Sequence, residues 1–203
     1  MIVGSRPLAT VLTWKPFAAT AVATATWLAL SDPPSPLLLS TAAAAVAATT
    51  PFVLDDPGAA TLQSSPTTLL HRRAHRAALV LPLLGSWWAL AVTIVSRSTA
   101  DLPPAAHTLQ LTALVAIGFA GASTTSRVGG DSSPGGTTGA LVVIACFGTA
   151  FLPARSLQVV PADPTAPGAA RQLVAILAVA VAIQLGASAD PARRMTPLRR
   201  VRV

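Results

Sequence analysis

Charge is the scarcest property of this sequence. Only 10% of its 203 residues are Asp, Glu, Lys or Arg, whereas soluble domains carry about 25%. Glutamate is absent and lysine occurs once, at Lys15, while 52% of the residues are hydrophobic. A chain so poor in charge cannot cover the surface of a water-soluble domain. We therefore predict that lipid, rather than water, surrounds most of it.

The shortage of lysine also excludes one way of binding ATP. A Walker-type loop needs a glycine-rich segment that ends in Gly-Lys followed by Ser or Thr, and Lys15 is not preceded by one. The Gly/Ser/Thr-rich segment 129–139 has no lysine and is interpreted as a loop. Neither a carboxylate pair nor a Ser-His-Asp pattern is evident. We predict that the chain is not an enzyme and binds no cofactor.

The sequence also has few residues that could form a disulfide, a metal site or a nucleic-acid-binding surface. The single cysteine, Cys146, excludes an intrachain disulfide. His71 and His75 have the spacing of metal ligands on a helix, but three neighbouring arginines repel a cation, so we predict no metal site. No stretch forms the basic face of a soluble nucleic-acid-binding fold. The formal net charge of +7 is therefore interpreted as a signal for membrane orientation.

The sequence does contain six mostly apolar segments that have no Asp, Glu, Lys, Arg or His. They are residues 17–31, 36–53, 77–96, 108–123, 140–153 and 172–188. A membrane-spanning helix needs about 20 residues, so the shorter segments require flanking residues. We predict an all-α integral membrane protein in which residues 1–203 form a single domain, with a six-span bundle over 17–188.

Basic residues are distributed unevenly between the loops that six spans define. One side holds Arg6, Lys15, Arg72, Arg73, Arg76, Arg127, Arg193, Arg194, Arg199, Arg200 and Arg202, and the other holds Arg97, Arg155 and Arg171. Because loops rich in Arg and Lys stay cytoplasmic, we predict a multi-pass protein of the cell membrane with both termini in the cytoplasm. Residues 1–16 are then a cytoplasmic or interfacial segment, or else a disordered tail, and residues 189–203 are a basic cytoplasmic tail.

The six segments also lack ionisable residues. Ion-coupled carriers usually place Asp, Glu or His at membrane depth, so a self-sufficient secondary transporter is disfavoured. Gln110 and Gln184 are the amides near the hydrocarbon and are expected to make interhelical hydrogen bonds. If the chain moves a solute uphill, another chain must supply the energy.

The loop after the second segment is the most individual part of the chain. Residues 54–67 run Leu-Asp-Asp-Pro-Gly-Ala-Ala-Thr-Leu-Gln-Ser-Ser-Pro-Thr. Asp56 at an N-cap and Pro57 at the first helical position favour a helix start, and Pro66 favours its end. We predict a short cytoplasmic helix between spans two and three. Arg72, Arg73 and Arg76, which follow it, are expected to lie at the anionic lipid surface.

This loop resembles that of permease subunits of ABC transporters of the type-2 exporter class, and that of small, divergent permease-like proteins of actinobacteria. The matching residues are Asp55 or Asp56, Gly58, Thr61, Leu62 and Pro66. The resemblance implies a coupling helix that docks on an ATP-binding cassette ATPase subunit, and a dimer with an identical or a different permease chain. Gln63 departs from the acidic residue usual after Thr-Leu. An ordinary capped turn beside a basic cluster is the alternative interpretation.

Trp87 and Trp88 fall near the middle of the third segment, although membrane tryptophans prefer the interfaces. The pair could line a path for an apolar substrate or could pack against neighbouring helices. Small residues at 116–122 favour close helix contacts, within the chain or between subunits. We expect a permease subunit that forms the translocation path. A non-transporting accessory or scaffold subunit is the main alternative, and a passive channel or secondary carrier is a further one.

Overall fold

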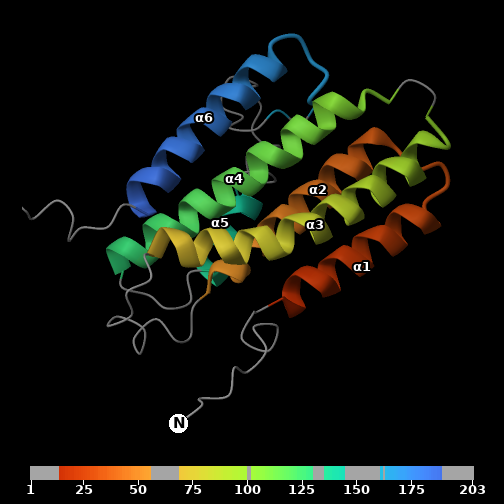
Figure 1. Ribbon diagram of the computed structural model, residues 1–203. Coiled ribbons are helices and arrows are strands. Elements are labelled where there is room, and N and C mark those ends of the chain that lie inside the picture. The colour runs from red at the N-terminus through yellow and green to blue at the C-terminus, as the bar shows by residue number, and fades with distance from the viewer. Residues whose placement is uncertain are drawn as a thin grey trace, which may run out of the picture.

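The computed structural model describes residues 14–55, 69–99, 102–129, 135–144, 161 and 163–188, and within them the chain is helical with no strand. The elements are α1 (Lys15–Leu30), α2 (Pro36–Thr49), the 3-10 helix η2 (Thr50–Leu54), α3 (Leu69–Ser96), α4 (Pro104–Gly129), α5 (Gly135–Val143) and α6 (Ala169–Ser188). The long helices lie side by side along one common direction (Figure 1).

The long helices alternate in direction, so their ends gather at two ends of the bundle. The Asp55 end holds the start of α1, η2, the start of α3 and the ends of α4 and α6, and the His107 end holds the opposite termini (Figure 1). Hydrogen bonds support this arrangement. Arg73 near the start of α3 donates to Ser126 near the end of α4, and Ser98 after α3 donates to the Pro34 carbonyl before α2 at 3.2 Å.

Four helical stretches of the described part are long and apolar enough to cross a membrane. They are Pro36–Leu54, Arg73–Ser96, Pro104–Ser126 and Ala169–Ala187. This confirms the predicted all-helical class for the described residues. Four of the six predicted segments are helices that suit a membrane. Helix α1 coincides with the first segment but has 16 residues, or about 24 Å at 1.5 Å per residue, short of a hydrocarbon core of about 30 Å. The fifth segment, 140–153, lies mostly outside the described residues, so six spans remain a prediction.

The outward faces of the helices are apolar. Helix α6 exposes Val174, Val179, Val181, Ile183 and Leu185, and α3 exposes Leu79, Leu81, Leu83 and Leu90. Contiguous apolar surface of this kind is unfavourable in water and suits contact with acyl chains. The described helices therefore form a bundle that is apolar outside as well as inside.

Helix α2 is the central element. Within its span 67% of the residues are buried, against 17% of the residues in the span of α6. Helix α2 packs against α1, α4 and α5. Ser35 caps it by accepting a hydrogen bond from the Leu38 N–H at 3.3 Å, with Pro36 in the first turn. Alanines along its buried faces leave room for neighbouring backbones to approach closely.

The small-residue surface predicted on α4 serves contacts within the chain. A Cβ atom on Gly118 would lie 3.1 Å from Pro51 of η2, and one on Gly121 would lie 2.6 Å from Thr138 of α5. Further along α4, the Ser123 hydroxyl donates to Gln184 Oε1 of α6 at 2.5 Å. This confirms the predicted interhelical hydrogen bond of Gln184.

Candidate functional sites at the two ends of the bundle

Asp55 organises one end of the bundle. Its side chain is 5% exposed, and its Oδ1 accepts a hydrogen bond from the Gly135 N–H of α5 at 2.7 Å. Its backbone carbonyl accepts a second hydrogen bond, from Nη1 of Arg76 on α3, at 2.5 Å. The residue that precedes the predicted coupling segment is thereby attached to two other helices.

The approach of α5 to Asp55 depends on glycine. A Cβ atom at Gly135 would lie 2.7 Å from Phe52 Cα and 2.8 Å from Asp55 Oδ2, and one at Gly139 would lie 2.6 Å from the Ala48 carbonyl oxygen. The interpretation of residues 129–139 as a loop is wrong for Gly129, which ends α4, and for residues 135–139, which begin α5. Close packing against α2 and η2 compensates there for the low helix propensity of glycine.

Two of the arginines in the basic run also make contacts within the chain. Helix α3 begins at Leu69, so Arg73 and Arg76 lie in its first turns instead of in a loop. Arg73 is 8% exposed and donates to the Ser126 hydroxyl of α4. The expectation that these two side chains rest on the lipid surface is therefore wrong for Arg73 and incomplete for Arg76, which binds the Asp55 carbonyl.

Most residues of the predicted coupling segment lie outside the described residues. These are Asp56, Thr61, Leu62 and Pro66. Asp55 is described, and its buried carboxylate accepts the Gly135 N–H of α5; its contact with a partner remains a prediction. The short helix expected between spans two and three also falls in residues 56–68, outside the described part, and remains a prediction.

Trp87 and Trp88 lie in the packed interior of the bundle, at 7% and 9% exposure. The Trp87 indole N–H donates to the Ala21 carbonyl of α1 at 3.0 Å, and the Trp88 indole N–H donates to Thr108 Oγ1 of α4 at 2.9 Å. The two rings are 6.0 Å apart at a 38° tilt. Both side chains thus hold neighbouring helices to α3, and their place on a transport path remains a prediction.

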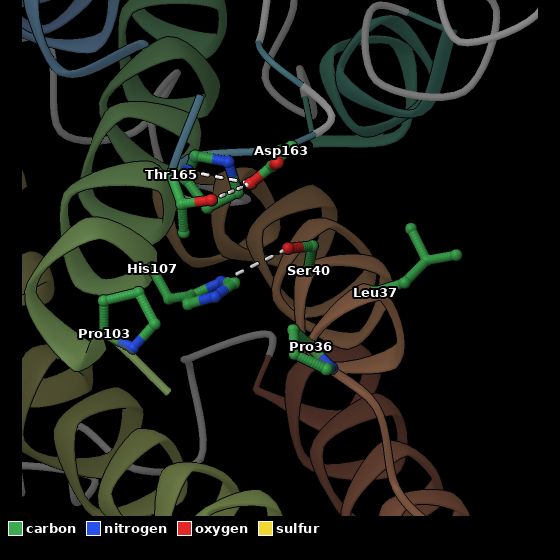
Figure 2. Close-up of a pocket in the computed structure, with 8 residues that line it drawn as sticks. Pro36, Leu37, Ser40, Pro103, His107, Asp163 and Thr165 are labelled. Carbon is green, nitrogen blue, oxygen red and sulfur yellow. Dashed lines mark hydrogen bonds between the residues drawn. The ribbon is translucent and has the colours of Figure 1, made fainter. Parts of the chain in front are cut away.

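A second polar cluster lies at the His107 end. Helix α4 begins at Pro104, so His107 is inside the helix and within the candidate span Pro104–Ser126. Its side chain is 2% exposed, and its Nδ1 lies 3.3 Å from Ser40 Oγ of α2 (Figure 2). The expectation of spans without ionisable residues is therefore wrong for the helices as they fold. His107, Arg73 and Arg76 lie outside the apolar segments but inside α4 and α3, because each helix begins several residues before its segment.

His107 and Ser40 border a cavity of about 410 Å³. The other lining residues are Pro36, Leu37, Pro103, Asp163, Pro164 and Thr165. Asp163 belongs to the turn before α6, where its Oδ1 accepts hydrogen bonds from the Thr165 hydroxyl at 2.6 Å and the Thr165 N–H at 2.9 Å. These two bonds hold the pKa of Asp163 below its usual 3.8, so its carboxylate is ionised at neutral pH.

The cavity brings together a serine, a histidine and an aspartate that the sequence pattern did not connect. A hydrolytic triad places the nucleophile on one ring nitrogen of the histidine and the carboxylate on the other. Ser40 lies on Nδ1, Nε2 has no hydrogen-bond partner within the described part of the chain, and no hydrogen bond joins Asp163 to His107 there. The arrangement differs from a triad and instead presents polar groups in a mostly apolar cavity.

Comparison of the sequence and structure with protein-family models, with curated proteins and with solved structures finds no match.

Proposed function

We propose that the chain is the membrane-spanning permease subunit of an ABC-type exporter, in which it forms the translocation path and couples to a separate ATPase subunit. The anchoring of Asp55 is the observation that supports this best. Residues 56–68 follow Asp55, which is bonded to Gly135 of α5 and to Arg76 of α3. A partner bound to this segment would therefore act directly on the bundle.

The C-terminal end of residues 56–68 is connected to the bundle as well. It leads into α3, whose Arg73 donates to Ser126 of α4. A displacement of the segment would thus reach α3, α4 and α5 together, through hydrogen bonds that already join them. Hydrogen-bond networks and rigid helices of this kind carry coupling between distant sites.

The proposal also includes the orientation of the bundle in the membrane. The Asp55 end carries Arg73 and Arg76, and the predicted excess of basic residues falls on that side of the bundle. With the Asp55 end in the cytoplasm, the segment with the Thr61-Leu62 pair faces the compartment that supplies ATP. The His107 end then faces outward.

A non-transporting accessory subunit is the second candidate, and the filled centre of the bundle favours it. Trp87 and Trp88 are bonded to α1 and α4, and Leu114 between them and the Asp55 end is 1% exposed. Such packing suits a scaffold for a partner that transports. Both candidates require a partner, and the identity of that partner separates them.

Co-purification in mild detergent, followed by mass spectrometry, tests the proposal. The intact chain is expected to bring down an ATP-binding cassette subunit. We expect Leu62→Asp to abolish this, because burial of a leucine contributes roughly 1.5–3 kcal/mol to an interface and a buried charge reverses that gain. Gln63→Asp is the matched control, since it adds the same charge one residue away, where the resembling permeases carry an acidic residue.

Two results would contradict the permease proposal. One is recovery of a full-length permease or another membrane complex without any direct contact to an ATPase, which favours the accessory subunit. The other is equal recovery of the ATPase with the Leu62→Asp and Gln63→Asp variants at equal membrane levels, which removes the coupling segment from the contact. The purified chain alone is expected to show only background ATP hydrolysis.

A further inference from the structure

The cavity at the His107 end has the size and lining of a small-ligand site. Sites for small organic ligands occupy about 300–1,000 Å³, and this cavity measures about 410 Å³. Three prolines and Leu37 supply apolar walls from the starts of α2 and α4 and from the turn before α6. Figure 2 shows His107 and Ser40 facing one another across these elements, with Asp163 and Thr165 on the adjoining turn.

The charge of the lining selects for a cation. Asp163 is the one carboxylate among the described residues that line the cavity, and none of those residues is Lys or Arg. The bonds from Thr165 hold this carboxylate in one position and in its ionised form. An anion would be repelled, whereas a positively charged group gains Asp163, on the exposed turn at the cavity, as a counter-ion beside the apolar walls.

His107 supplies a buried polar atom that lacks a partner. Its Nε2 is covered and has no hydrogen bond within the described residues, and unpaired buried polar atoms are uncommon enough to point to a functional role. Ser40, which bonds the other ring nitrogen, has a hydroxyl that can donate or accept. When Ser40 accepts from Nδ1–H, Nε2 offers a lone pair to a donor.

We propose that this cavity is a binding site for a small organic ammonium ion with an apolar body. Asp163 is its counter-ion, His107 Nε2 accepts one of its N–H hydrogens, and Leu37 and the prolines contact its hydrocarbon part. Nε2 is covered in the structure, so this contact forms when the imidazole turns about its Cβ–Cγ bond toward the cavity, and the Ser40–Nδ1 bond is broken in that turn. The inference is independent of the proposed function, because the site lies at the end of the bundle opposite Asp55.

Cyclohexylammonium and cyclohexanol, which share one ring and differ in charge, test the site without any variant. The intact chain is placed in nanodiscs of uncharged phosphatidylcholine, with empty nanodiscs as the blank, and its histidines are labelled with ¹⁵N. We expect cyclohexylammonium to bind at least tenfold more tightly than cyclohexanol. We also expect it to shift the His107 ring resonances and to leave those of His75, which is exposed on α3, unchanged.

Single variants assign the contacts. Asp163→Asn, in the exposed turn, is expected to weaken cyclohexylammonium binding at least tenfold, and His107→Gln is expected to weaken it by a smaller factor. His75→Gln is the control and should have no effect. Equal affinity for the two probes, unchanged binding to the Asp163→Asn variant, or shifts of His75 in place of His107 would each overturn the proposal.

Discussion

The Asp55 carboxylate accepts the backbone N–H of Gly135 at 2.7 Å, although 80 residues separate the two along the chain. The bond joins the end of η2 to the first turn of α5 and is closed to solvent, since both residues are buried. Helix N-termini carry unpaired N–H groups and a partial positive charge, so a buried carboxylate at this position is both satisfied and electrostatically favourable. The contact fixes the direction in which α5 enters the bundle.

Gly135 and Gly136 should respond differently to the same substitution. A Cβ atom on Gly135 would meet Phe52 Cα at 2.7 Å, whereas one on Gly136 meets nothing within 4 Å. We expect Gly135→Ala to lower the free energy of unfolding by about 1–3 kcal/mol through overpacking. Gly136→Ala should leave it unchanged or raise it by up to about 1 kcal/mol, the gain in helix propensity. Denaturant unfolding in detergent measures both, and equal effects would contradict the packing.

Replacement of the central tryptophans separates packing from a role in transport. Trp87→Phe and Trp88→Phe each remove an indole N–H that donates across helices, at a cost of about 1 kcal/mol of stability. Trp27→Phe, at a side chain that is 46% exposed, is the control and should cost less. If the chain is the proposed exporter subunit and the pair only packs, export per folded molecule stays constant in all three variants. A change in export confined to the central pair would place it on the path.

Cysteine labelling can test the predicted orientation. In a Cys146→Ala background, Ala74→Cys introduces a thiol at an exposed position near the Asp55 end, and Ser98→Cys introduces one at the His107 end. An impermeant maleimide applied to intact cells should label Ser98→Cys, and should label Ala74→Cys only after permeabilisation. The reverse pattern would place the Asp55 end outside the cell.

Asp163 should make the folded chain more sensitive to acid. Its pKa is held below 3.8 by the hydrogen bonds from Thr165, so it contributes stability above its unfolded pKa and loses that contribution as the pH falls through the lowered folded value. Thr165→Val removes the hydroxyl donor and leaves the backbone one. We therefore expect the pKa of Asp163 to rise toward its usual value, as followed by NMR of the side-chain carboxyl carbon. An unchanged pKa would show that the hydroxyl bond is not formed.

Hydropathy was sufficient to predict much of the helical class of the described residues. The apolar segments that fall within the described residues correspond to helices, because a lipid-facing surface and a packed core both require apolar residues, and the second segment begins at Pro36, as α2 does. The interhelical bond of Gln184 was also predictable, since an amide in an apolar environment needs a partner.

Local signals could not predict the contacts that depend on tertiary packing. Gly135 and Gly139 are typical of a loop, and only the presence of Phe52 and Ala48 opposite them makes a helix there favourable. The His107 cavity draws on three segments that are distant in sequence, and no spacing rule connects Ser40, His107 and Asp163. Hydropathy alone does not predict the buried positions of Arg73 and His107, because a charged residue or a histidine ends an apolar segment even where the helix continues through it.

The start of α1 and the end of α6 lie at the same end of the bundle (Figure 1). A linker from one copy to the next would therefore not have to cross the bilayer, and two copies could be expressed as one polypeptide. Such a tandem chain would allow Leu62 to be changed in one half while the other stays intact. If the chain is the proposed permease and acts as a dimer, such a tandem would reveal whether the pair needs one working contact with the ATPase or two.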